Sequence, residues 1–175
     1  MKEKRKGLIQ FAGQDVTVIG PDLEVGQQAP DFKVHAQDWS TFRGLADTSG
    51  KVRIIAAVPS LDTGVCDRET RRFNQAAAEL SDQITILVIS MDLPFAQKRW
   101  CGAAGVEQVQ VLSDHRWAQF GKRYGCLIKE QRLLRRAVFV VDQDDKVVYV
   151  DYMAALGNEP DYEAVLAAAR QALAA

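Results

Sequence analysis

One nearly continuous apolar run, followed by a proline and then by an amphipathic stretch, constrains the fold of this chain most. The run is Val52–Val58; it is partly β-branched, ends at Pro59 and precedes charged amphipathic residues 66–80. This order is typical of a buried parallel strand that leads into a helix. Residues 84–89 repeat the strand signal. We therefore expect strands that alternate with helices around one sheet.

Proline, glycine and capping residues indicate where further strands and helices begin and end along the chain. Residues 8–18 alternate around Gly13 as a hairpin would, and Pro94 and Gly105 bound a predicted helix. Three further strands are predicted at 109–112, 137–141 and 147–150. One further helix is predicted to run from a cap at Ser113 or Asp114 to about Tyr124, and another covers 161–174. The prediction is a single α/β domain over 8–175, with a central mixed sheet, flanking helices and an N-terminal β-hairpin, after a flexible basic extension over 1–7.

The charge balance and the apolar segments restrict the partners. Lys and Arg number 22 against 23 Asp and Glu, so nothing global favours nucleic acid or an anionic membrane. The apolar stretch after the basic start is too short for a signal peptide, and no stretch is long enough for a membrane helix. We expect a cytoplasmic protein whose partner is a small molecule or another protein. In the cytoplasm, three cysteines indicate catalysis, redox sensing or inert burial rather than a disulfide framework.

Cys66 lies where the buried strand gives way to a helix. If Thr63 is near the helix N-cap, Cys66 falls in the first turn, where free N–H groups and the helix dipole favour an anion. A thiolate is such an anion, and cysteines in such positions are often reactive. The alternative is a small buried hydrophobic side chain, the common fate of a free cysteine. The polar turn over 59–64 favours an accessible thiol instead.

These residues carry a family resemblance. The pattern Pro59-x-x-x-Thr63-x-x-Cys66 resembles the active-site motif of the peroxiredoxins, and the full run over 59–66 is similar to that of their thiol peroxidase subgroup. Further matches occur in the same order along residues 8–175. They are Arg72-Phe73-Asn74, Asp92-Leu-Pro-Phe-Ala-Gln97 with Cys101-Gly102, Arg136-Ala137-Val138, and Glu159-Pro-Asp-Tyr162-Glu163.

The resemblance implies a thioredoxin-like fold, a homodimer, and reduction of hydrogen peroxide and organic hydroperoxides with thioredoxin as the electron donor. It implies that Cys66 is the peroxidatic nucleophile, that Thr63 orients sulfur and peroxide, and that Pro59 shields the site from water. Arg136 would hold thiolate and peroxide with its forked donors. Arg135 is a second candidate for that role, since only the Arg-Ala-Val match selects its neighbour.

The other two cysteines have different expected roles. A sulfenic acid on Cys66 condenses with a nearby thiol or risks further oxidation, and the resemblance makes Cys101 the resolving cysteine of an intrachain disulfide. By pattern alone it is a helix core residue. The two cysteines are expected in the opening turns of separate helices, so disulfide formation would need local unwinding near Cys66 and in segment 94–102. For Cys126 we favour a buried structural thiol over a second disulfide or a zinc site.

Several alternatives remain open. The cysteines, His35 and His115 lack the spacing of zinc ligands, and no phosphate-binding glycine-rich loop occurs, so neither metal nor cofactor is expected. His115 could be the base of a Cys/His hydrolase, but a helix-capping neighbourhood explains it more simply. A thioredoxin-like oxidoreductase would need a Cys-x-x-Cys pair, which is missing. A redox sensor that uses the same two thiols to change a protein contact is the alternative to an enzyme.

Overall fold

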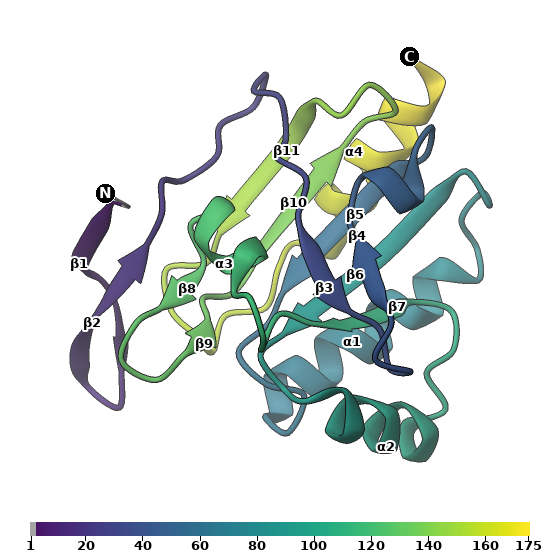
Figure 1. Ribbon diagram of the computed structural model, residues 1–175. Helices are drawn as coiled ribbons and strands as arrows, with labels where there is room; N and C mark the ends of the chain where they lie inside the picture. Colours follow the sequence, from purple (N-terminus) through teal and green to yellow (C-terminus); the bar gives the residue numbers. More distant parts are fainter. Residues whose placement is uncertain (1–2) are drawn as a thin grey trace.

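The chain folds around a seven-stranded mixed sheet with a smaller four-stranded sheet at one side (Figure 1). The computed structural model describes residues 3–175. The strands are β1 (Lys4–Phe11), β2 (Gln14–Ile19), β3 (Lys33–His35), β4 (Thr41–Arg43), β5 (Val52–Ala57), β6 (Ile84–Ser90), β7 (Gln110–Ser113), β8 (Leu127–Ile128), β9 (Leu133–Leu134), β10 (Ala137–Val141) and β11 (Val147–Tyr152). The helices are the short 3-10 helix η1 (Ala46–Thr48), α1 (Gly64–Ala77), α2 (Pro94–Ala104), α3 (Gln119–Arg123) and α4 (Tyr162–Ala174).

The larger sheet runs in the order β11-β10-β5-β6-β7-β3-β4. Strands β5, β6 and β7 are mutually parallel, whereas β10 and β3 flank them antiparallel. The sheet is therefore mixed, as predicted. Because β5 and β6 lie in its centre, the connections that follow their carboxyl ends, before α1 and α2, meet at one edge.

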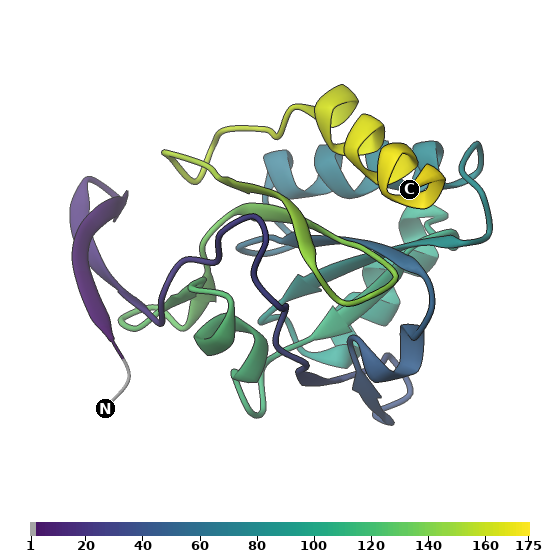
Figure 2. The ribbon, with the colours of Figure 1, turned by 90° about the horizontal axis from the view of Figure 1, so that it is seen from above.

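Both faces of the sheet are covered, which explains why β5 is almost entirely apolar. Ile54 packs in a cluster with Phe73 of α1 and Val165 of α4. The next residue, Ile55, packs in a second cluster that contains Phe120 of α3. Figure 2 shows α1 and α4 on one side of the sheet and α3 on the other. No helix within residues 3–175 has the length and apolar character needed to cross a membrane.

The predicted N-terminal hairpin is present, but it starts earlier than the sequence suggested. Strand β1 begins at Lys4 and pairs antiparallel with β2, with Ala12 and Gly13 at the turn in left-handed conformations. Residues 4–7 thus belong to a strand and not to a separate extension. The prediction for residues 1–2 lies outside the described residues.

Helix α3 is much shorter than predicted. A helix from Ser113 or Asp114 was expected, but Ala118 has φ +48°, and the helix begins only after it. The buried Asp114 carboxylate accepts hydrogen bonds from Phe120 N (3.1 Å) and Gly121 N (2.8 Å). Asp114 therefore caps the helix from a distance, across a loop that the sequence pattern did not indicate.

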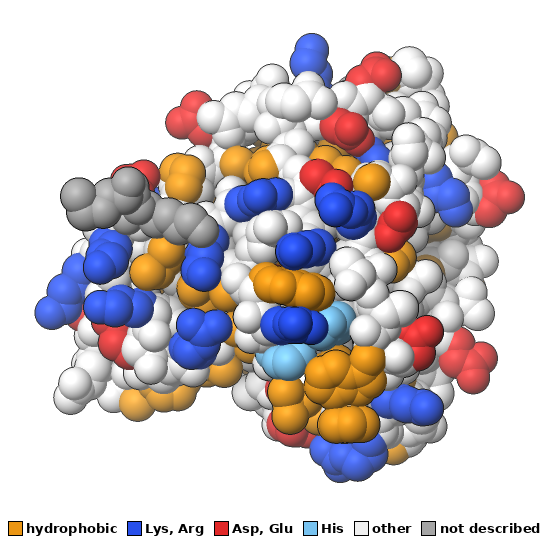
Figure 3. Space-filling model, in the orientation of Figure 1, with side chains coloured by type: hydrophobic (Ala, Val, Ile, Leu, Met, Phe, Trp, Pro, Cys, Tyr) orange, Lys and Arg blue, Asp and Glu red, His pale blue; other side chains and the backbone are white. Residues whose placement is uncertain are grey.

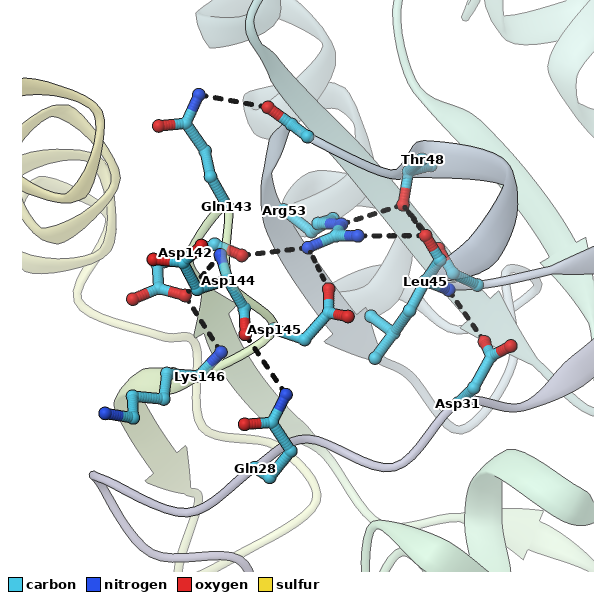
Figure 4. Close-up of polar contacts among 12 residues, drawn as sticks. Gln28, Asp31, Leu45, Thr48, Arg53, Asp142, Gln143, Asp144, Asp145 and Lys146 are labelled. Atoms are coloured by element: carbon cyan, nitrogen blue, oxygen red, sulfur yellow. Dashed lines mark hydrogen bonds and ion pairs between the residues drawn. The ribbon is translucent and has the colours of Figure 1, made fainter.

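The start of β5 is held by a fully buried arginine (Figure 4). Arg53 donates from Nε to Thr48 Oγ1 (2.8 Å), from Nη2 to Leu45 O (2.9 Å) and from Nη1 to Asp142 O (2.8 Å). It also forms an ion pair with Asp145 at 2.7 Å. One guanidinium thus joins η1, β5 and the turn of the β10-β11 hairpin, at the end of β5 that lies away from Cys66.

Replacing this arginine should destabilise the fold without touching the site. We expect Arg53→Met to lower the free energy of unfolding by roughly 3 kcal/mol, because it leaves buried carbonyl groups without donors. Urea unfolding measures the change. Arg99→Met, at a side chain that is 72% exposed, is the matched control and should change stability by less than about 0.5 kcal/mol. A loss below about 1 kcal/mol for Arg53→Met would show that water replaces these bonds.

Candidate active site

Cys66 occupies the predicted place in the first turn of α1. Strand β5 ends at Ala57, the buried Pro59 follows, and Thr63 is the N-cap of α1. The Cys66 thiol is therefore near the positive end of the helix dipole. It differs from the prediction in one respect: its side chain is fully buried rather than accessible.

A buried arginine from a distant part of the chain contacts this sulfur. Arg136, directly before β10, places Nη2 3.1 Å from Cys66 Sγ. Its Nε donates to Leu156 O at 2.9 Å, which fixes the plane of the guanidinium. Arg135, the second candidate, binds Asp22 at 2.9 Å and lies over the Tyr152 ring instead. The geometry thus brings Arg136 to the candidate nucleophile.

Glu69 completes this cluster and was not singled out from the sequence. Its side chain is fully buried, and its Oε2 accepts a hydrogen bond from Arg136 Nη1 at 2.5 Å. Its Oε1 has no hydrogen-bond partner among the described residues. Burial raises the pKa of Glu69 to about 7, although the charge and hydrogen bond of Arg136 act to lower it. A signal was available, because Glu69 lies on the face of α1 that also carries Cys66 and Phe73.

This raised pKa gives a testable dependence of stability on pH. Between pH 4.5 and about 7 the folded protein holds the Glu69 proton more tightly than the unfolded chain does. The group's contribution is thus fully present below pH 4.5 and is lost as pH rises to about 7, a fall on the order of 3 kcal/mol. Urea unfolding at several pH values should show this fall in the wild type, and Glu69→Gln should lack it.

The pH comparison must be made as a difference between the two proteins. Burial also raises the pKa of Asp114, to about 6, so that carboxyl contributes in the same direction in both. A difference between wild type and Glu69→Gln that stays constant from pH 4.5 to 8 would contradict the assignment to Glu69.

The two remaining motif residues, Pro59 and Thr63, belong to the segment that leads into α1. The Thr63 hydroxyl donates to Ser60 O at 3.0 Å and does not cap α1 with its side chain. Pro59 is buried at the end of the strand and leads into the turn. The structure thus places both residues in the segment that precedes Cys66.

Cys101 lies in α2, as expected, but near the carboxyl end of that helix rather than in its opening turns. Its sulfur accepts a hydrogen bond from Gln37 Nε2 at 3.3 Å, and burial raises the pKa of the Cys101 thiol. Cys66 and Cys101 are free thiols that belong to the same apolar cluster. They occupy separate helices, and each has a polar partner of its own.

Cys126 and His115 lie apart from this cluster. Cys126 is fully buried, its thiol donates to Tyr124 O at 3.4 Å, and burial raises its pKa. This agrees with a structural thiol. His115 Nε2 lies 3.3 Å from His35 Nδ1, in an aromatic group with Trp39. The hydrogen bond to Cys66 Sγ comes from Arg136 and not from a histidine.

The arrangement fits a thiol that reacts as an anion. A helix N-terminus and a guanidinium both stabilise negative charge on sulfur. Arg136 has further N–H donors, and a planar guanidinium can hold a second acceptor beside the sulfur. The site is thus suited to attack by sulfur on a small molecule whose leaving atom gains negative charge.

Comparisons with known proteins agree with this geometry. The family model described as Redoxin matches residues 24–166. The protein named thiol peroxidase from Oceanobacillus iheyensis is 56% identical over 158 residues, which are 90% of this chain and 95% of that protein. A thiol peroxidase from Bacillus subtilis is 52% identical over 162 residues, 93% of this chain and 96% of its own.

Solved structures extend the likeness to the fold. A peroxiredoxin-like protein from Aquifex aeolicus superposes with a TM-score of 0.86 at 37% identity and covers 98% of both chains. The thiol peroxidase from Chromobacterium violaceum gives a TM-score of 0.81 at 24% identity, covering 95% of this chain and 97% of that one, and supports the fold alone. The thioredoxin-like fold expected from the motif is confirmed.

Proposed function

Since the chain belongs to the thiol peroxidase subgroup of the peroxiredoxins, within the Redoxin family, we propose that it reduces hydrogen peroxide and organic hydroperoxides through Cys66 and that thioredoxin recycles it. The chain is a thiol-dependent peroxidase of the peroxiredoxin type. The observation that carries the proposed route is the 3.1 Å contact between Arg136 Nη2 and Cys66 Sγ.

In the first step the Cys66 thiolate attacks one peroxide oxygen. A sulfur–oxygen bond forms, the O–O bond breaks, and the leaving oxygen takes a proton from water and departs as an alcohol or as water. Cys66 becomes a sulfenic acid, oxidised by two electrons, while the peroxide is reduced by two. Arg136 stabilises the sulfur anion and the charge on the leaving oxygen, Thr63 orients the peroxide with its hydroxyl, and Pro59 keeps bulk water away.

In the second step the sulfenic acid condenses with the Cys101 thiol. A sulfur–sulfur bond forms and one water leaves, so no further oxidant is needed. Both thiols are buried in separate helices, whereas a disulfide tolerates Cα atoms up to about 7 Å apart. We therefore propose that the segments around Cys66 and over 94–102 open locally. Thioredoxin then reduces the disulfide by dithiol exchange and is itself oxidised.

We also propose a cytoplasmic homodimer built from one domain per chain. An exposed apolar patch supports the dimer: Leu93 is 49% exposed, Phe95 is 70% exposed and packs on Trp39, and all three lie at or near the first turn of α2. Figure 3 shows hydrophobic side chains gathered on this face beside two histidines. Monomeric proteins rarely leave such side chains together in water. Analytical ultracentrifugation measures the assembly.

Steady-state turnover tests the proposed function. Thioredoxin, thioredoxin reductase and NADPH are mixed with the protein and hydrogen peroxide, and NADPH oxidation is followed. Many equivalents of NADPH consumed per chain support the recycled peroxidase. NADPH consumption that stops after one equivalent favours a sensor. If thioredoxin supports no NADPH oxidation while a small dithiol still supports repeated peroxide consumption, the reductant is another protein or thiol.

A further inference from the structure

One carboxylate binds the segment that leads to Cys66. Asp92 lies between β6 and α2, and its Oδ1 accepts a hydrogen bond from Ser60 Oγ at 2.8 Å. Its Oδ2 accepts from Leu61 N at 2.9 Å and from Ser90 Oγ at 2.7 Å. The turn over 59–63, which positions Cys66, is thus attached to the connection that starts the helix of Cys101.

The same hydrogen-bonded chain continues into α2. Ser90 Oγ, which donates to Asp92, accepts from Gln97 Nε2 at 3.0 Å. Gln97 is fully buried and also donates to Leu112 O at 2.8 Å. It lies one helical turn before Cys101, on the same buried side of α2. Side chains of four residues therefore connect the two cysteine-bearing segments: Ser60, Asp92, Ser90 and Gln97.

From this chain of contacts we infer that Asp92 is a positioning residue that holds both cysteine segments closed and makes them open together. The inference rests on the proposed function, because it concerns the second step. While the network is intact, Cys66 stays beside Arg136 and reacts with peroxide. When Asp92 releases Ser60 and Leu61, the network also loses its hold on Gln97, and the two segments can rearrange.

The strength of this network decides which of two reactions consumes the Cys66 sulfenic acid. A Cys66 sulfenic acid in the closed state can react with a second peroxide, which adds oxygen and gives the sulfinic acid. In the open state it condenses with the Cys101 thiol and releases water. Weaker contacts at Asp92 thus favour the disulfide over irreversible oxidation, at the expense of the closed reactive state.

Asp92→Asn tests the inference, with Asp62→Asn as the matched control. The asparagine side chain has one acceptor oxygen in place of two: an NH2 group in the place of Oδ2 faces the Leu61 N–H donor, and one in the place of Oδ1 forces Ser60 Oγ to change from donor to acceptor. Asp62 belongs to the same turn, but its side chain is 67% exposed and, among residues 3–175, its carboxylate makes only a 3.8 Å ion pair with Arg99. Stopped-flow fluorescence of the reduced proteins with hydrogen peroxide separates a peroxide-dependent phase, oxidation of Cys66, from a first-order phase, disulfide formation.

We expect Asp92→Asn to speed the first-order phase about tenfold and to change the peroxide-dependent phase less than about threefold. Ser60→Ala, which removes one of the bonds to Asp92 and a 3.3 Å bond from Asp62 N, is the milder variant and should speed the first-order phase about threefold. Mass spectrometry should then find less sulfinic Cys66. Amide hydrogen exchange should become faster in both 59–67 and 94–101.

Three results would overturn the inference: a first-order rate in Asp92→Asn equal to that of Asp62→Asn, no effect of Ser60→Ala, or faster exchange in only one of the two segments. If Asp92 only stabilises the fold in general, Asp92→Asn would slow the peroxide-dependent phase as well as change the first-order phase. Failure of the proposed function is recognised separately, because the wild type would then show no peroxide-dependent phase at all.

Discussion

Replacing Cys66 by serine is expected to abolish peroxide reduction, with a residual rate at least about 1,000-fold below that of the wild type. A serine hydroxyl stays protonated near neutral pH and cannot act as the thiolate does. The replacement is nearly isosteric, and the new oxygen can still accept the hydrogen bond from Arg136 Nη2 that the sulfur accepts now. The loss should therefore be chemical. Peroxide consumption with a small dithiol as reductant measures it.

The control for this variant is Cys126→Ala. Cys126 is fully buried, and burial raises the pKa of its thiol. We expect this variant to keep at least about half of the activity, with some loss of stability from the small cavity it leaves. Retained activity in Cys66→Ser, together with a loss in Cys126→Ala, would reverse the assignment of the nucleophile.

Cys101→Ser should separate the first oxidation from the cycle. We expect thioredoxin-supported turnover to fall at least about 100-fold, because the sulfenic acid then lacks the Cys101 thiol with which it condenses. The rate of the first oxidation should stay within about threefold, since the contact between Cys66 and Arg136 is unchanged. Stopped-flow mixing gives the first rate, and NADPH oxidation gives the second.

Mass spectrometry of Cys101→Ser after peroxide provides the decisive product. The expected species are Cys66 sulfenic acid and its more oxidised forms, whereas the wild type should lose the mass of two hydrogen atoms and gain no oxygen. Full thioredoxin-supported cycling by the variant would instead assign the resolving role to Cys126 or to a second chain. Non-reducing electrophoresis distinguishes these two, because only the second produces a covalent dimer.

Local signals predicted the part of the site that lies along one stretch of chain. A buried strand, a proline and a capped helix occur within a short segment, so the place of Cys66 in the first turn of α1 followed from spacing alone. The end of α2 at Gly105, which has φ +67°, followed in the same way from one glycine. In each case the physical cause lies within a few residues of its effect.

Contacts between distant segments could not be derived in this way. Nothing in the residues around Arg136 shows that it reaches Cys66, 70 positions earlier, and only the family motif selected it over Arg135. Glu69 had a readable signal, a charge on the buried face of a helix, but its partner had to be known before that signal could be interpreted. The exposure of Cys66 was misjudged for a related reason: a polar turn precedes it, yet the side chain is buried and in contact with Arg136 from a distant part of the chain.

Short elements were missed because their stabilisation comes from elsewhere. Strand β8 has two residues and pairs on one side with β2 and on the other with β9, and β3 and β4 have three residues each. Such segments carry too little pattern to reveal their period. The late start of α3 depends on the buried carboxylate of Asp114, whose hydrogen bonds cross a loop.

Arg53, at the far end of β5, limits how far the proposed local opening can extend along the strand. A peroxidase that opens around its nucleophile exposes backbone at every turnover, and exposed strands invite proteases and aggregation. Here the strand that carries the reactive turn is fastened at its opposite end by Arg53 to two other parts of the fold. Opening can therefore stop at the last residues of the strand, so the enzyme's working lifetime depends on a residue that never meets its substrate.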